Sequence, residues 1–110
     1  MRFGASLFGT RRKTQVLELL ALLEESHALE LARLLGVTAK TVQRIVDGFE
    51  AQGLIEGRTV GRERRLTFNR RFPAMEQLRS VLVELGNTDP EVSSAANSLR
   101  RRPRGKRKAI

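Results

Sequence analysis

The feature that most constrains the fold of this chain is a change of hydrophobic period within residues 29–69. Before Gly53, apolar residues recur at helical spacing in two runs that meet at the turn Gly36-Val37-Thr38. After Gly53 the period falls toward two, which is typical of strands, and the chain reverses near residues 59–63. The predicted order is helix, tight turn, helix and hairpin, and few small folds contain it.

The first of these helices is predicted over residues 28–35 and the second from residue 39 to about residue 52. The first helix buries one apolar face, made of Ala28, Leu31, Ala32 and Leu35. Gly36 is suited to the left-handed backbone position that ends a helix. Thr38 is suited to cap the second helix, because its hydroxyl can accept a hydrogen bond from an early backbone N–H.

The second helix has two faces of different chemistry. Its apolar face, which must point inward, carries Val42, Ile45, Val46 and Phe49. The opposite face carries Lys40, Gln43, Arg44 and Asp47 at the same spacing. Arginine can bind guanine through O6 and N7, and glutamine can bind adenine through N6 and N7. Many surface helices have a polar outer face, but one placed directly after a glycine turn and a threonine cap favours insertion into the major groove of DNA.

The hairpin that follows is rich in arginine. Between residues 58 and 71 there is one acid, Glu63, and there are six arginines, at positions 58, 62, 64, 65, 70 and 71. Such a hairpin gains more from lying along a sugar-phosphate backbone than from packing, although the arginines can instead pair with acids of the first two helices. The sequence therefore predicts a mainly α fold with a small β-hairpin wing, a winged helix-turn-helix with a three-helix core plus a C-terminal helix.

The first core helix is predicted from an N-cap at Thr10 to about Ser26. Its apolar stripe is wider than one packing partner requires, so the helix is either central to the domain or shared with a second subunit. Three cations, at residues 11–13, occupy its first turn, where positive charge is unfavourable. Either a nearby phosphate compensates them or water solvates them. Residues 24–27 form a connection, with one short extended segment beside the hairpin.

A fourth helix is predicted from Pro73 to about residue 85, ended by Gly86. Its apolar residues have the spacing of a coiled-coil seam, which together with the first core helix suggests a homodimer interface. The predicted dimerisation residues are Leu17, Met75, Leu78, Leu82 and Leu85. The alternative is that this helix folds back on its own domain.

The last segment, residues 87–110, lacks an apolar period and is predicted to be disordered. It holds seven basic and two acidic residues, a net charge of +5. Such a tail can contact DNA or RNA phosphates without choosing a sequence, or it can bind an acidic protein. The predicted organisation is a winged helix DNA-binding domain over residues 1–72, a C-terminal helix for dimerisation over 73–86, and a basic tail over 87–110.

Composition narrows the classes of protein that remain. A chain of 110 residues with a net charge of +9 and a pI of about 11.5 favours one domain and a polyanionic partner, the alternative being charge that serves solubility alone. With no cysteine, disulfides and thiolate metal sites are excluded, and the single histidine, His27, fits a turn better than a metal site. The longest apolar run, residues 19–23, is far below the roughly 20 residues of a membrane span, and no secretory signal is recognised.

These observations also argue against catalysis. The chain has no cysteine nucleophile, one histidine, no phosphate-binding glycine loop and no evident carboxylate pair, so neither an enzyme nor a cofactor is expected. The expected location is the cytoplasm, in association with the nucleoid.

Several segments carry a family resemblance. The matching segments are Leu7-Phe8-Gly9, residues 30–36, residues 38–44, residues 50–55 and Gly61-Arg62. In these segments the chain resembles winged helix-turn-helix transcriptional regulators of the ArsR/MarR-like superfamily, and most closely small regulators associated with nucleotidyltransferase operons. The resemblance covers about three quarters of the chain.

The resemblance implies a dimer on a pseudo-palindromic site, with Lys40, Gln43 and Arg44 at the recognition positions and Arg62 at the wing tip. Two departures matter. Metal-sensing relatives use cysteine or clustered histidine ligands, which this chain lacks. Arg64 stands where relatives have an apolar strand residue, so we expect a frayed hairpin or a register shifted by one residue.

The function that these patterns favour is sequence-specific binding of double-stranded DNA by a transcriptional regulator, a repressor that acts by occupying its operator. The predicted DNA-binding residues are Thr38, Lys40, Thr41, Gln43, Arg44, Arg58, Arg62, Arg64 and Arg65. Two alternatives stay open at this point. One is an antitoxin-like or recombination and replication accessory protein whose winged helix contacts protein, and the other is an RNA-binding protein that uses the basic tail.

Overall fold

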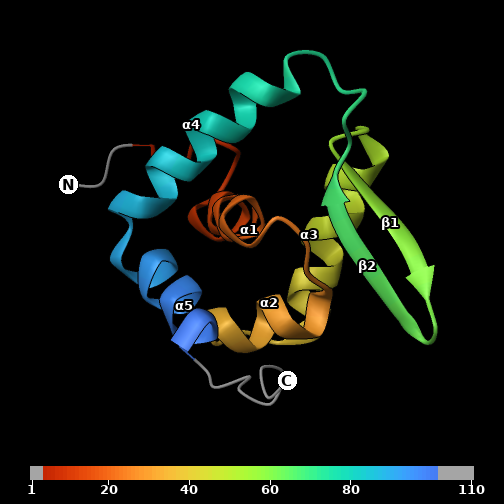
Figure 1. Ribbon diagram of the computed structural model, residues 1–110, viewed down its shortest axis with the longest axis horizontal. Coiled ribbons are helices and arrows are strands. Elements are labelled where there is room, and N and C mark those ends of the chain that lie inside the picture. The colour runs from red at the N-terminus through yellow and green to blue at the C-terminus, as the bar shows by residue number, and fades with distance from the viewer. Residues whose placement is uncertain (1–3, 102–110) are drawn as a thin grey trace, which may run out of the picture.

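The computed structural model describes residues 4–101, and for Arg100 and Arg101 only the backbone. In this part of the chain, helix α1 is the centre of the fold, and the other helices surround it with the hairpin at one edge (Figure 1). The elements are α1 (Arg11–Leu23), α2 (Ala28–Leu35), α3 (Ala39–Ala51), β1 (Ile55–Val60), β2 (Glu63–Phe68), α4 (Met75–Thr88) and α5 (Pro90–Arg101). None of the described helices is both long and apolar enough to cross a membrane.

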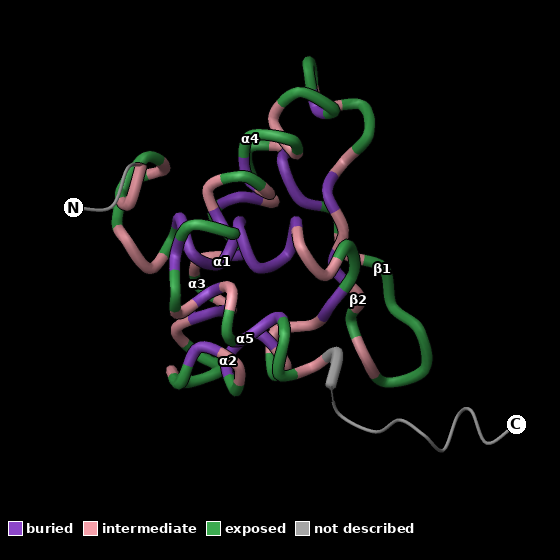
Figure 2. Tube along the Cα trace, turned by 60° about the vertical axis from the view of Figure 1, so that its left-hand side comes forward, coloured by how far each residue is buried: buried purple, intermediate pink, exposed green. Residues whose placement is uncertain are grey.

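Helix α1 is buried around its whole circumference, which favours the first of its two predicted alternatives, a central place in the domain. Residues 14–21 are all buried, and they form the longest continuous buried stretch in Figure 2. The Thr10 hydroxyl accepts a hydrogen bond from the backbone N–H of Lys13, at 3.1 Å, and so caps the helix as predicted. The helix ends at Leu23 rather than near Ser26, because Glu24 takes a positive φ and Ser26 forms a β-bridge with Leu66.

The helix-turn-helix unit has the predicted boundaries to within one residue. Gly36 has a φ of 70°, the left-handed conformation that a glycine adopts without strain. The Thr38 hydroxyl accepts a hydrogen bond from the backbone N–H of Thr41, at 3.1 Å. Val42, Val46 and Phe49 are buried as predicted, and Ile45 packs half-buried against the same core. The inward face of α3 is therefore fixed, and with it the residues that face outward.

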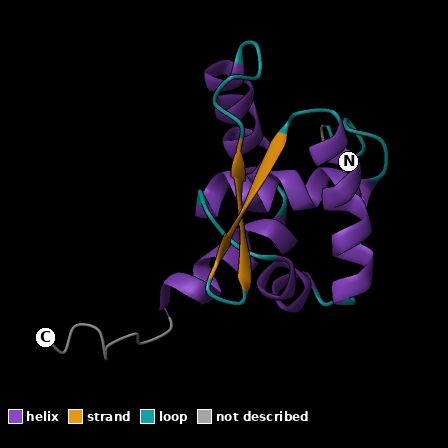
Figure 3. Ribbon diagram, turned by 90° about the vertical axis from the view of Figure 1, so that its right-hand side faces the viewer, coloured by secondary structure: helices purple, strands orange, loops and turns teal. Residues whose placement is uncertain are grey.

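The two strands pair along their whole length without a bulge. Ile55 is paired with Phe68 at one end and Val60 with Glu63 at the other. The two-residue turn is Gly61-Arg62, in which Gly61 has a φ of 67°. Strand β2 also bridges to Ser26, so it pairs with β1 on one side and with the connection between α1 and α2 on the other. Figure 3 shows the two strands crossing in front of the helices. The expectation of a frayed hairpin was wrong, because every residue of β1 is paired with a residue of β2.

Helix α4 differs from its prediction at both ends. It begins at Met75, because Ala74 has a φ of 60° and Pro73 belongs to the preceding turn. It continues through Gly86 to Thr88, so Gly86 does not end the helix. A methyl group at Gly86 would lie 3.2 Å from Cβ of Glu18 and 3.5 Å from Cγ1 of Val92. This glycine therefore allows α4 to approach α1 and α5 closely.

The predicted dimer seam is buried inside the protomer. Leu17 and Leu82 have no exposed surface and Met75 is 5% exposed. Leu78 is half-buried against the same core, and Leu85 is half-buried beside Gly4. The assignment of this seam to a homodimer interface was wrong, because α4 folds back onto α1 and uses these side chains there.

The prediction of disorder from residue 87 onward was wrong for the residues that the structure describes. Asp89 caps α5 by accepting hydrogen bonds from the backbone N–H groups of Glu91 and Val92. Pro90 occupies the first helical position, where a proline is tolerated. Val92, Ala95 and Ala96 are buried, and α5 packs against α1, α2 and α4. The rest of the predicted tail, residues 102–110, lies outside the described residues.

Candidate nucleic-acid interface

The outer face of α3 presents the residues that the sequence predicted there. Lys40, Arg44 and Asp47 are exposed, and Gln43 is half-buried. Lys40 and Arg44 form no hydrogen bond or ion pair with any residue that the structure describes. Because both cations keep their full hydrogen-bonding capacity, each can donate to a base edge or a phosphate.

Gln43 is held by its neighbour one turn later on α3. Its Nε2 donates a hydrogen bond to Oδ1 of Asp47, at 2.9 Å. A carboxylate only accepts hydrogen bonds, so this contact fixes which way the Gln43 amide faces. One N–H and the carbonyl oxygen of Gln43 remain for a base edge. This role of Asp47 was not predicted, although its i, i+4 spacing from Gln43 is a signal for such a contact.

The two threonines of the predicted interface serve the helix start. Beyond the cap to the Thr41 backbone, the Thr38 hydroxyl donates to the Thr41 hydroxyl, at 2.9 Å. Thr38 is exposed and Thr41 is half-buried. The hydroxyl pair therefore orients the first turn of α3, whose backbone N–H groups are a favourable place for a phosphate.

The four wing arginines of the predicted interface divide into two pairs. Arg58 and Arg62 are exposed and have no ion-pair or hydrogen-bond partner among the described residues. Arg64 forms an ion pair with Glu50, in the last turn of α3. Nε of Arg65 lies 3.2 Å from a carboxylate oxygen of Glu25, in the segment before α2. Nη1 of Arg65 lies 3.9 Å from a carboxylate oxygen of Glu63. Arg64 and Arg65 therefore pair with acids, but not with acids of the first two helices as that alternative had it. Their partners lie in the last turn of α3, in the connection between α1 and α2, and on β2.

The acids that bind Arg64 and Arg65 were not predicted from the sequence. Glu50 and Arg64 are fourteen residues apart, and their contact depends on how the hairpin crosses α3. Glu25 lies in the connection between α1 and α2, where it carried no signal. His27, in the same connection, lies with Nδ1 2.5 Å from a carboxylate oxygen of Glu63. No group of three or more acids or histidines within the described residues is arranged to hold a metal ion.

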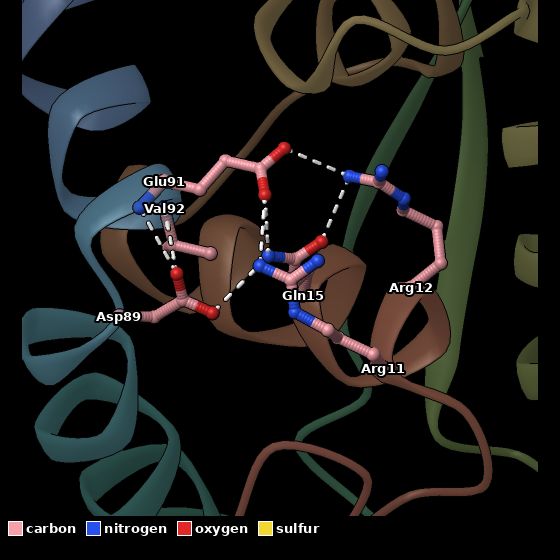
Figure 4. A network of polar contacts seen from close by, with 6 residues as sticks. All are labelled: Arg11, Arg12, Gln15, Asp89, Glu91 and Val92. Atoms are coloured by element: carbon pink, nitrogen blue, oxygen red, sulfur yellow. Dashed lines mark hydrogen bonds and ion pairs between the residues drawn. The ribbon is translucent and has the colours of Figure 1, made fainter. Parts of the chain in front are cut away.

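The side of the molecule formed by α1 and α5 has a different electrostatic character. Arg11 and Arg12 donate to the two carboxylate oxygens of Glu91, at 3.1 and 2.9 Å. Gln15 donates to Asp89 and Glu91, each at 3.1 Å, which completes the network in Figure 4. The hydrogen bond from Gln15, followed by the one from Arg12, lowers the pKa of Glu91 below its ordinary value. A protein carboxylate, rather than a phosphate or water alone, thus compensates two of the three cations in the first turn of α1, Arg11 and Arg12.

A comparison with protein families supplies independent evidence. The model of the MarR family matches residues 10–66, which span α1, the helix-turn-helix and most of the hairpin. Comparisons with curated proteins and with solved structures found no match. Members of the MarR family are regulators that bind double-stranded DNA and typically act as dimers. Together with the unpaired cations of α3 and the wing, this match shows that the chain belongs to the MarR family of DNA-binding transcription regulators.

Proposed function

We propose that this protein binds a specific double-stranded DNA site and represses transcription by occupying it. The observation that carries the proposal is the distribution of free cations. Lys40 and Arg44 on α3, and Arg58 and Arg62 on the wing, are exposed without partners among the described residues. Helix α3 and the hairpin are adjacent, as a helix in the major groove and a wing on the flanking backbone require.

The proposed division of labour follows from the chemistry of each side chain. Arg44 and Gln43 read base edges, because both can form bidentate pairs. Lys40 and the N-terminal backbone of α3 bind phosphate. Arg58 and Arg62 follow the backbone beside the site, and Arg62 at the turn can enter a narrow minor groove. A bound protein of this size blocks polymerase without any further activity.

The same proposal includes a dimer and a phosphate-binding C-terminal segment. A dimer on a pseudo-palindromic site is supported by the family and must use surfaces other than the buried α4 seam.

Residues 100–110 hold seven basic residues and no acid, so they carry +7 of the net +9. We propose that this segment binds DNA phosphates at the nucleoid in a sequence-independent way. Deletion of residues 102–110 should therefore flatten the salt dependence of DNA binding while leaving α5 in place.

The experiment that tests the proposal is a selection of bound duplexes from a random pool, followed by substitution of Arg44. Arg44→Ala should weaken binding to the selected site by about 1–3 kcal/mol and leave binding to random duplex nearly unchanged. Arg79→Ala, which removes one positive charge from α4, is the matched control and should have little effect on either duplex.

Three results would contradict parts of this proposal. Equal loss on every duplex would remove Arg44 from the residues that read bases. Enrichment of no duplex sequence would contradict sequence-specific binding. Preferential enrichment of RNA from a mixed pool would favour the RNA-binding alternative. Sedimentation equilibrium at micromolar concentration tests the dimer separately, and a strictly monomeric protein on and off DNA would contradict it.

A further inference from the structure

Arg64 occupies an unusual place for a wing arginine. On an antiparallel hairpin alternate residues share a face, so Arg64 lies on the same face as Leu66 and Phe68, which are buried. It extends this inward-facing row by one residue toward the wing tip. From there its guanidinium reaches back to Glu50 at the end of α3. Arg58 and Arg65, which are paired across the strands, lie on the opposite face.

The opposing strand has a glycine where the Arg64 side chain passes. A methyl group at Gly57 would overlap the guanidinium of Arg64. The backbone does not require glycine at this position, because Gly57 is not among the residues with positive φ. The missing side chain of Gly57 therefore serves to make room for Arg64.

We infer that Arg64, seated over Gly57 and paired with Glu50, is a clamp that fixes the wing relative to the recognition helix α3. This inference rests on the proposed function, since it assigns Arg64 to positioning and leaves Arg58 and Arg62 as the wing residues that touch DNA. Strand β2 is already attached to the segment before α2 through its bridge to Ser26. The clamp adds a second link, between the wing and α3. A wing fixed before binding loses less conformational entropy when α3 and the wing engage one duplex together.

The exposure of the pair limits how large its effect can be. The side chain of Arg64 is 49% exposed and that of Glu50 is 21% exposed. Ion pairs with this degree of exposure are weak, so loss of the clamp should lower affinity for the selected site by about three- to fivefold. The loss should be much smaller for random duplex, where α3 and the wing need not be in register.

The decisive variant is Gly57→Ala, which keeps both charges and displaces only the guanidinium of Arg64. The displaced group is the flexible end of a long side chain, so little stability should be lost. Gly48→Ala is the matched control, because a methyl group added there meets no atom within 4 Å. Arg64→Gln removes the cation itself, and the double reversal Glu50→Arg with Arg64→Glu restores an ion pair at constant net charge.

Two measurements are made on each variant. Backbone amide order parameters and hydrogen exchange of residues 58–65 report on the wing in the free protein. Affinities for the selected and the random duplex, measured over a range of salt concentrations, report on binding. We expect Gly57→Ala and Arg64→Gln to loosen the free wing and to lower selected-site affinity alike, with an unchanged salt slope. The double reversal should restore much of both properties, and Gly48→Ala should resemble the wild type.

Other results would overturn the clamp. An ordered wing and unchanged affinity for the selected duplex in Gly57→Ala would contradict the clamp. A normal wing in Arg64→Gln, combined with a salt slope lower by about one unit on both duplexes, would make Arg64 a phosphate contact instead. Failure of the wild type to bind any duplex specifically would contradict the proposed function, whereas the order of the free wing would still decide the clamp.

Discussion

The α1–α5 side and the α3–wing side of this molecule are both rich in arginine, yet they use it differently. At α1 and α5, Arg11 and Arg12 both bind Glu91, so each already has a carboxylate partner within the protein. On α3 and at the wing tip, Arg44 and Arg62 have no partner among the described residues. The difference teaches that the pairing of cations, rather than their number, marks the surface available to a polyanion.

The charge count of residues 4–99, the part whose side chains the structure describes, supports this distinction. Residues 4–99 contain thirteen basic and twelve acidic residues, a net charge of only +1. The high pI of the chain thus comes mostly from residues 100–110 and says little about which face of the fold binds DNA. Residues 4–99 are nearly neutral as a whole, so the positive character of the α3–wing side comes from an uneven distribution of their charged side chains.

The largest effect that we predict concerns α4, whose packing completes the α1–α5 side. Leu82→Ala should lower the free energy of unfolding by about 2–5 kcal/mol, because Leu82 has no exposed surface and leaves a cavity. Val81→Ala is the control, because the neighbouring Val81 is 46% exposed, and it should change the free energy of unfolding by under about 0.5 kcal/mol. Urea denaturation at two protein concentrations measures both. A loss that depended on protein concentration would return Leu82 to a subunit interface.

The next effect is a pH dependence that originates in the same region. Burial raises the pKa of Glu18 to about 7 from its ordinary 4.5, with a further contribution from Asp89 and an opposing one from Arg11. Between these two pH values the folded protein holds a proton that the unfolded chain has released. The stability conferred by this group therefore falls as the pH rises from about 4.5 to 7 and stays low above that range.

Glu18→Gln should remove this dependence. The variant should be more stable than the wild type by roughly 3 kcal/mol at pH 8 and equal to it near pH 4. Thermal or urea unfolding from pH 4 to pH 9 measures the difference, and Glu84→Gln, at an exposed position of α4, is the control. If Glu18→Gln followed the wild type at every pH, the buried carboxyl would not be the source of the pH dependence.

Local signals account for the parts of the fold that sequence analysis predicted well. Gly36 and Thr38 end one helix and begin the next through their own backbone and hydroxyl groups, so the boundaries of α2 were correct. The outward face of α3 followed from the spacing of Val42 and Val46 alone. These features depend on residues close in sequence, which a single chain displays fully.

The errors concern residues whose role depends on a distant element. Gly86 lies inside α4 and does not end it. The role of this glycine is to let α1 approach, because a side chain there would meet Glu18 and Leu22. Helix α5 had a signal, an Asp-Pro start followed by Val92, Ala95 and Ala96 at helical spacing, but its serines and small side chains resemble a linker. At the site, the pairing of Arg64 with Glu50 depends on the inward face of β2, which only the register reveals.

A smaller effect separates the wing arginines by their pairing. Arg62→Ala should reduce the slope of log affinity against log salt by about one unit on random duplex, because one phosphate contact is lost. Arg65→Ala removes the same charge from a residue already paired with Glu25, so it should change the slope less. Titrations at four salt concentrations measure both slopes. Equal slopes for the two variants would contradict the claim that pairing decides which cations meet DNA.

The smallest predicted effect lies in the network of Figure 4. The side chains of Arg12 and Glu91 are about one third exposed, so Glu91→Gln should cost only about 0.5–1 kcal/mol of stability at pH 7. The pKa of Glu91 is lowered in the folded state, so its contribution is present above the ordinary value of 4.5 and is lost as the pH falls through the lowered pKa. Wild type and variant should therefore converge in strong acid.

A double-mutant cycle with Arg12→Gln isolates the pair, and it should give a coupling energy that declines with salt. Neither single variant should change the affinity for the selected duplex, because the two residues bind each other in the α1–α5 network and neither belongs to α3 or the wing. A loss of DNA affinity in Arg12→Gln at unchanged stability would show that this arginine leaves Glu91 for a phosphate. The contrast between paired cations at α1 and α5 and unpaired cations on α3 and the wing would then fail, since a paired cation would be as available to DNA as an unpaired one.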